Sequence, residues 1–172
     1  MSLEMQLNHF SLSGCVLFMA EAPCFLLAED SECDVLLVRK AMSQAGMDSP
    51  LFVVRDGEEA IAYLNGEGKF ADRSEYPMPD LLFLDLAMPK INGFEVLQWI
   101  RQQPGLSDLR VIVLTSSQNI HDMKTAYLLG ANSFLRKPIN FKDLFQISRF
   151  LPVRFLLPNE PREIPRSSPD PG

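Results

Sequence analysis

Short apolar runs alternate five times with longer amphipathic stretches between residues 25 and 150 of this chain. The runs are uniformly apolar and short, which suits strands that are buried on both faces of a sheet. We therefore predict strands over 25–28, 51–54, 81–84, 111–114 and 133–135. Strands joined by helical stretches are typical of parallel sheets with right-handed crossovers. The pattern predicts an α/β fold built on a doubly wound five-stranded parallel sheet.

The stretches between the strands carry apolar residues at helical spacing. Helices are predicted over 32–45, 58–64, 94–102, 119–129 and 141–150. Gly46, Gly66 and Gly130 follow three of them, where a left-handed backbone commonly ends a helix. The connection 67–79 is rich in charge, glycine and proline, and a loop of this length is expected to be functional or mobile.

The composition restricts the classes of partner. With 16 Lys and Arg against 22 Asp and Glu, the net charge of -6 argues against direct contact with nucleic acid. Residues 10–28 are largely apolar, but Glu21 and Pro23 interrupt them and no Lys or Arg precedes Arg39. We therefore expect neither a signal peptide nor membrane insertion.

Cysteine and histidine usage indicates a reduced setting. The three cysteines leave one unpaired in any disulfide scheme, and the two histidines have no zinc-finger spacing. We expect a cytoplasmic protein. At 172 residues the chain suits one domain, predicted over 25–151, with an N-terminal tail over 1–24 and a proline-rich C-terminal tail over 152–172.

Polar side chains follow four of the five predicted strands. Glu29 and Asp30 follow the first strand, Asp85 the third and Thr115 the fourth, while Lys137 comes shortly after the fifth. Ligands of open parallel sheets bind beyond the carboxyl ends of the strands, so these groups are expected to converge. Three converging carboxylates repel one another unless a cation neutralises them, and Mg²⁺ prefers such oxygen ligands.

This constellation favours phosphoryl chemistry. A bound Mg²⁺ would offset the charge of an incoming phosphoryl group, and Thr115 and Lys137 would hold its oxygens. Asp85 would then act as the nucleophile and form an acyl phosphate.

Four ordered strings in the chain resemble the receiver domains of two-component response regulators. They are LLAED at 26–30, LDLAMPKING at 84–93, LTS at 114–116 and GANSFLRKP at 130–138. The resemblance covers about 25–150 and implies the flavodoxin-like (βα)5 receiver fold, also called CheY-like.

The same resemblance implies roles for individual residues. Asp85 would be the phosphoacceptor, and Asp30 a direct Mg²⁺ ligand. Glu29 would help to bind the ion, most simply through water, and the main-chain carbonyl of Ala87 would complete the protein ligands. Ala87 and Ser117 are small where many relatives carry larger polar groups near the phosphate, which leaves the lifetime of the phosphorylated state open.

Further features resemble one branch of the family. The connection 67–79, the VRDGEEA string at 54–60 and the absence of an output domain from this chain are similar to small stand-alone receivers paired with phytochrome-type histidine kinases. The resemblance implies a sensor histidine kinase or a phosphotransfer protein as the upstream partner. The downstream protein partner is not identified by the sequence.

Thr115 and Phe134 are the candidate switch residues. If the Thr115 hydroxyl moves toward a phosphoryl oxygen, it leaves space that Phe134 can enter. Core filling is an equally good interpretation of Phe134, because aromatic residues are common in strands. The switch would change the face formed by the fourth helix, fifth strand and fifth helix, where we expect partner binding, most simply as a homodimer.

Two other functions compete with a phosphorylated signalling module. A Mg²⁺-dependent phosphohydrolase of the haloacid type also uses an Asp nucleophile, but it carries a second Asp two residues later, where this chain has Ala87. A receiver-like module that binds partners without phosphorylation is disfavoured, because competent residues fill all five site positions. We therefore expect a regulatory protein rather than a metabolic enzyme.

Overall fold

The computed structural model describes residues 23–47 and 49–148. Strands and helices alternate along the chain as predicted. The strands are β1 (Phe25–Ala28), β2 (Leu51–Val54), β3 (Leu81–Asp85), β4 (Arg110–Thr115) and β5 (Ser133–Arg136). The helices are α1 (Glu32–Gln44), α2 (Gly57–Asn65), α3 (Gly93–Gln102), α4 (Ile120–Leu128) and α5 (Phe141–Ser148), with a short 3₁₀ turn, η1 (Gly68–Phe70). Nearly all of the predicted tails, 1–24 and 152–172, lies outside the described residues.

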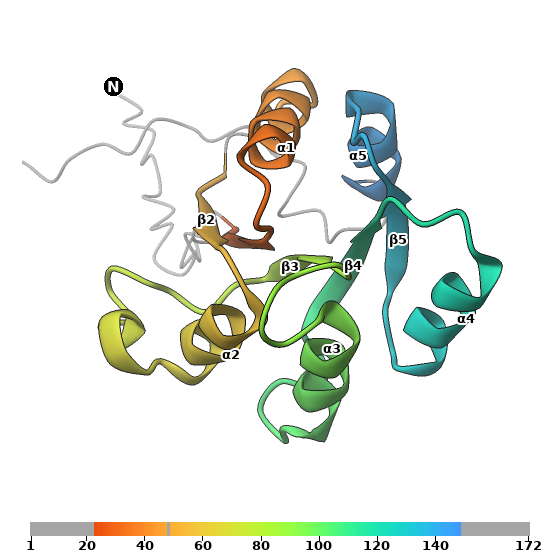
Figure 1. The fold of residues 1–172 in the computed structure, drawn as a ribbon. Coiled ribbons are helices and arrows are strands. Elements are labelled where there is room, and N and C mark those ends of the chain that lie inside the picture. Colours follow the sequence, from red (N-terminus) through yellow and green to blue (C-terminus); the bar gives the residue numbers. More distant parts are fainter. Residues whose placement is uncertain (1–22, 48, 149–172) are drawn as a thin grey trace, which may run out of the picture.

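The five strands form one parallel sheet in the order β2-β1-β3-β4-β5. Helices α1 and α5 cover one face of this sheet, and α2, α3 and α4 cover the other (Figure 1). The predicted doubly wound five-stranded fold is thereby confirmed. The order of strands places β1 and β3 side by side in the middle, so that the segments after them emerge at the centre of one sheet edge.

Alternate residues of the strands supply the two halves of the core. Leu26 and Leu82 point toward the helices α2 to α4, whereas Phe25 and Leu27 point toward α1 and α5. This is the two-residue period of a strand that is covered on both sides. Phe83 continues the second layer and packs edge-on against Phe25, with ring centroids 6.2 Å apart.

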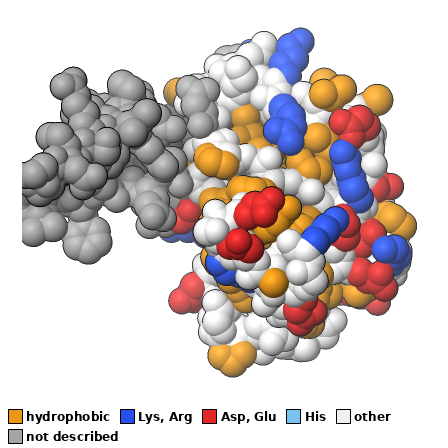
Figure 2. All heavy atoms as spheres, turned by 90° about the vertical axis from the view of Figure 1, so that its left-hand side faces the viewer, with side chains coloured by type: hydrophobic (Ala, Val, Ile, Leu, Met, Phe, Trp, Pro, Cys, Tyr) orange, Lys and Arg blue, Asp and Glu red, His pale blue; other side chains and the backbone are white. Residues whose placement is uncertain are grey.

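The edge strands depart from the prediction of burial on both faces. Three of the four β2 residues and the first two of β5 are only half-buried, whereas every residue of β1 and β3 is buried. The reason is position, because an outer strand has a neighbour on one side only. Figure 2 faces the β2 side and shows hydrophobic side chains exposed at its middle, with charged side chains around them.

The connection between α2 and β3 is held by specific contacts. The guanidinium of Arg73 donates to the carbonyl oxygens of Tyr63 and Leu64 at 2.8 and 2.7 Å, and so satisfies the end of α2. The Tyr63 hydroxyl donates to the Pro77 carbonyl at 3.0 Å. Phe70 is buried against the Tyr63 ring. The sequence led us to expect that this loop is either functional or mobile, and these contacts argue against mobility.

Helix α4 is the most lightly buried helix on its face of the sheet. Among its residues only Ala126 is buried, whereas α2 and α3 each bury four. Leu128 is 88% exposed and Tyr127 is 51% exposed. Arg101 of α3 holds the turn after α4, because its guanidinium donates to the Gly130 carbonyl at 2.7 Å.

No helix in the described part of the chain is long and apolar enough to cross a membrane.

Candidate functional site

The register of the central strands brings the predicted polar residues together. Leu84 lies opposite Ala28 of β1, so Glu29 emerges beside Asp85. On the other side Asp85 lies opposite Leu114, and Thr115 follows it at the end of β4. Glu29, Asp85 and Thr115 are all buried, whereas Asp30 is exposed at the rim.

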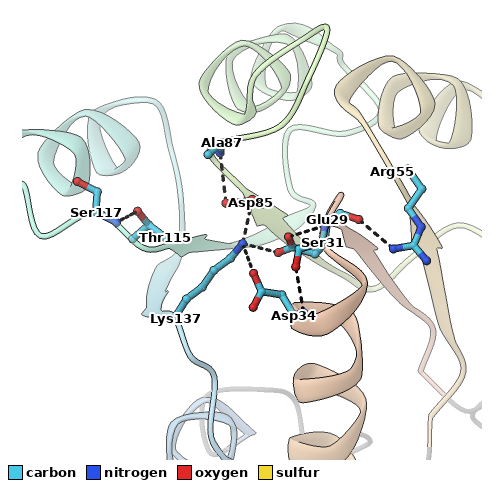
Figure 3. A network of polar contacts seen from close by, with 9 residues as sticks. All are labelled: Glu29, Ser31, Asp34, Arg55, Asp85, Ala87, Thr115, Ser117 and Lys137. Atoms are coloured by element: carbon cyan, nitrogen blue, oxygen red, sulfur yellow. Dashed lines mark hydrogen bonds and ion pairs between the residues drawn. The ribbon is translucent and has the colours of Figure 1, made fainter.

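The ammonium of Lys137 lies at the centre of the site (Figure 3). Its Nζ atom is 2.6 Å from Oε2 of Glu29 and 2.9 Å from Oδ2 of Asp85. The Lys137 backbone amide donates to the Thr115 carbonyl at 2.9 Å, and the following Lys137–Pro138 bond is cis. The hydrogen bond to the Thr115 carbonyl therefore holds the Lys137 backbone next to β4.

Burial and charge act on the titration of this cluster in opposite directions. Desolvation raises the pKa of Glu29 above its ordinary value, although the hydrogen bond to Lys137 partly opposes this. Burial alone would lower the pKa of Lys137, but its hydrogen bonds to Glu29, Asp85 and Asp34 outweigh burial and raise that pKa. The ammonium is therefore charged at neutral pH.

Glu29, Asp30 and Asp85 are suited to bind a metal ion. One carboxylate oxygen from each lies within 4.8 Å of the others. Apart from its ion pair with Lys137, Oε2 of Glu29 is buried with no hydrogen-bond partner among the residues that the structure describes. The Lys137 ammonium offsets part of the charge of these carboxylates, and hard oxygen ligands that converge in this way fit a divalent ion such as Mg²⁺. The donor set therefore fits the predicted ion.

The loop after β3 reaches the site through its backbone. The Ala87 amide donates to Oδ1 of Asp85 at 3.2 Å, which places Ala87 directly above that carboxylate. The loop returns to α3 at Gly93, whose amide donates to the Leu86 carbonyl at 3.1 Å. A Cβ atom on Gly93 would lie 2.2 Å from the Asp85 carbonyl, so only glycine allows this close approach.

The candidate switch residues lie on neighbouring strands. The Ser117 amide donates to the Thr115 hydroxyl at 3.0 Å, and the Ser117 hydroxyl is hydrogen-bonded to Asp122 of α4. Phe134 on β5 is half-buried and packs edge-on against Tyr127, with ring centroids 5.5 Å apart. A chain of contacts thus runs from Thr115 to α4.

Two residues at the site were missed by the sequence reasoning. Asp34 of α1 lies 3.0 Å from the Lys137 ammonium, and Arg55 lies 3.5 Å from the Glu29 carbonyl. Asp34 lies in the first turn of α1, three residues after the N-cap Ser31, so the Ser-x-x-Asp spacing of a helix start could have drawn attention to it. The Arg55 contact is to a backbone carbonyl, which no side-chain pattern reveals.

Comparison with known proteins agrees with this geometry. The family model of the response regulator receiver domain matches residues 25–149. The chain belongs to the response regulator receiver family of two-component systems, whose members are phosphorylated by histidine kinases. Response regulator Rcp1 of Synechocystis sp. is 41% identical over 122 residues, which cover 71% of this chain and 81% of Rcp1.

Solved structures give the same result. The response regulator RPA3017, in red light signalling of R. palustris, is 34% identical with a TM-score of 0.70, covering 75% of this chain and 93% of that one. The phosphorylated cyanobacterial phytochrome response regulator RcpA is 38% identical with a TM-score of 0.64, covering 74% and 89%. The Mn²⁺-bound form of Rcp1 is 39% identical with a TM-score of 0.63, covering 74% and 90%.

Proposed function

We propose that this protein receives a phosphoryl group on Asp85 and uses it to change partner binding. The observation that supports the proposal most directly is the Lys137 ammonium, which bridges the buried carboxylates of Glu29 and Asp85 beside the Thr115 strand end. Such a cluster combines a nucleophile with a fixed cation at the place where parallel sheets bind ligands.

The reaction is a phosphoryl transfer to a carboxylate. An Asp85 oxygen forms a bond to phosphorus while the bond between phosphorus and the donor's histidine nitrogen breaks, and the nitrogen keeps the electron pair. Lys137 and the Thr115 hydroxyl hold the oxygens of the transferred group. Slow attack by water on the acyl phosphate would reset the protein.

Glu29, Asp30 and Asp85, with the main-chain carbonyl of Ala87, would hold Mg²⁺. The ion supplies positive charge against the phosphoryl oxygens. The carboxylate cluster and the Mn²⁺-bound structure of the relative Rcp1 support a divalent ion in this place.

The upstream partner proposed is a histidine kinase of the phytochrome type or a phosphotransfer protein. Two of the similar structures support this, since RcpA is a phytochrome response regulator and RPA3017 belongs to red light signalling.

Intact-mass measurement after incubation with acetyl phosphate and Mg²⁺ tests the chemistry. We expect one added phosphoryl group on the native protein and none on Asp85→Asn. Asp108→Asn, which changes an exposed carboxyl elsewhere, should still be labelled. Steady release of phosphate without a labelled intermediate would favour the hydrolase, and no reaction at all would favour a module that works without phosphorylation.

The output surface proposed is the face of α4, β5 and α5, and its occupant is a second copy of this chain. Tyr127 and Phe145 are each about half exposed there, at 51% and 52%. Tyr127 packs on Phe134, so inward movement of Phe134 would change the shape of this face. Two-fold pairing is the commonest oligomeric arrangement.

Sedimentation with and without beryllofluoride, a mimic of the acyl phosphate, tests the output surface. We expect the mimic to shift the protein toward a dimer, and Tyr127→Ala to abolish the shift while the mimic still binds. Lys137→Ala should separate phosphorylation from partner binding. This variant should accept phosphate slowly, but its phosphorylation should not change partner binding. If the sedimentation mass does not change although beryllofluoride occupies Asp85, the proposed dimer is excluded.

A further inference from the structure

Three carboxylates, not two, surround the Lys137 ammonium. Besides Glu29 and Asp85, Oδ2 of Asp34 lies 3.0 Å from Nζ, and Figure 3 shows Asp34 approaching it from the α1 side. An ammonium group has three N–H donors, so three carboxylates can satisfy it fully. The Lys137 side chain is only 12% exposed, which makes each of these partners matter.

Asp34 differs from the other two carboxylates in what else it does. Glu29 and Asp85 belong to the group of oxygens that could hold a metal ion, whereas Asp34 is not among them. Asp85 is also the proposed phosphoacceptor. When the ion and the phosphoryl group are bound, both of these carboxylates have new partners, and Asp34 is the one whose charge is still directed at the ammonium.

The start of α1 fixes Asp34 in this place. The backbone amide of Asp34 donates to the Ser31 hydroxyl, which caps the helix, at 3.3 Å. The Ser31 amide in turn donates to Oε1 of Glu29 at 3.2 Å. The position of the Asp34 carboxylate is therefore set by the same short segment that carries Glu29 and Asp30.

We propose that Asp34 is a positioning residue, which holds the Lys137 ammonium against the phosphoryl group once Glu29 and Asp85 are engaged. The proposal rests on the proposed function and adds to it a residue from α1. It also means that α1 and the fifth strand are joined through the ammonium at the moment when the phosphoryl group arrives.

Two physical effects of removing Asp34 have opposite signs. Loss of a negative charge near the site would favour binding of an anion, because repulsion falls. Loss of the contact that holds Lys137 would weaken anion binding, because the ammonium must be ordered again when the anion binds. The positioning role requires that the second effect exceeds the first. The sign of the change therefore tests the proposal.

Calorimetric titration with beryllofluoride at saturating Mg²⁺ provides the measurement. We expect Asp34→Asn to weaken binding of the mimic about three- to tenfold, the range of a coupled polar contact. Asp108→Asn is the matched control, because it makes the same Asp-to-Asn change at an exposed carboxyl outside the site. This control should bind as the native protein does.

A conservative variant separates positioning from a structural effect. Asp34→Glu keeps a carboxylate that can reach the ammonium, and it should recover at least half of the lost affinity, with thermal midpoints checking that each variant is folded. Equal or tighter binding by Asp34→Asn would overturn the inference alone, as would a loss that Asp34→Glu shares in full. A native protein that does not bind the mimic at all would overturn the proposed function and the inference with it.

Discussion

The Lys90 ammonium lies 2.7 Å from Oδ2 of Asp56, and this pair ties the loop that follows Asp85 to the start of α2. Asp56 is also the N-cap of α2, because its side chain accepts from the Glu59 amide at 2.8 Å. Lys90 has a left-handed backbone with φ of 64°, a conformation that a residue with a side chain seldom adopts. The loop thus takes a strained conformation at the residue that makes the ion pair.

Removing the Asp56 charge should make stability less dependent on pH. Burial would raise the pKa of Asp56, but the hydrogen bonds from Lys90 and Glu59 outweigh burial and lower it below the ordinary 3.8. The folded state therefore binds this proton less tightly than the unfolded state does. The contribution is present above pH 3.8 and is lost as the pH falls through the lower folded pKa.

Urea unfolding of the native protein and of Asp56→Asn across this range provides the measurement. Asn is itself a good N-cap, so Asp56→Asn should lose mainly the ion pair, while Asp56→Ala should lose about 1 kcal/mol more with the cap. The difference between native protein and Asp56→Asn should shrink in acid. A difference that stays constant with pH would contradict the assignment.

Gly57→Ala should destabilise the fold by about 1 to 3 kcal/mol or more, because there is no room for a side chain at this position. A Cβ atom on Gly57 would lie 2.1 Å from the Ile91 carbonyl oxygen. This oxygen belongs to the backbone, so rotating a side chain cannot relieve the clash. Gly105→Ala is the control, since a Cβ atom there would meet nothing within 4 Å. Thermal unfolding should separate the two variants clearly, and equal midpoints would argue against this close packing.

Arg101→Met should cost about 1 to 3 kcal/mol of unfolding free energy, since several partly buried carbonyls lose their donor at once. The guanidinium donates to the carbonyl oxygens of Gly130 and Leu109 at 2.7 and 3.0 Å. Arg39→Met is a suitable control, because Arg39 makes one long contact of 3.5 Å to the Leu51 carbonyl. If both variants unfold at the same urea concentration, Arg101 does not hold these loops.

Cys24 should react with iodoacetamide far more slowly than Cys33 in the native protein. Burial raises the pKa of the Cys24 thiol to about 11, with Asp80 adding to the rise and the hydrogen bond with Tyr63 opposing it. Cys33 is exposed on α1. Peptide mass spectrometry of time points should show the difference, and it should vanish in urea. Similar native rates would mean that the start of β1 opens readily.

The strands and the convergent site residues could be predicted because they depend on local pattern. The apolar runs indicate where strands form, and in a parallel sheet their ends share one edge, so Glu29, Asp85 and Thr115 were expected at the same edge. The partial burial of β2 was not predicted, since an apolar run does not say which strand lies at the edge. Strand order depends on how the helices pack.

Contacts between distant elements were beyond the sequence for a different reason. Arg73 anchors the 67–79 connection by donating to backbone carbonyls, and every residue has one, so the sequence does not mark the acceptor. The ion pair between Lys90 and Asp56 joins residues 34 positions apart, and it uses a left-handed backbone at Lys90 that a lysine seldom adopts. Pairing of this kind is visible only once the backbone is known.

The single buried residue of α4 has a consequence for motion. Opening a helix costs roughly the apolar contacts that it gives up, and Ala126 is a small side chain. The amide hydrogens of α4 should therefore exchange with solvent well before those of α2 or α3. Because α4 gives up few contacts when it moves, a few new contacts near Thr115 can shift it to another arrangement. A deeply packed helix would need a far larger gain in interaction free energy. Substitutions on the outer surface of α4 should then change how readily this helix moves, even though they lie outside the phosphorylation site.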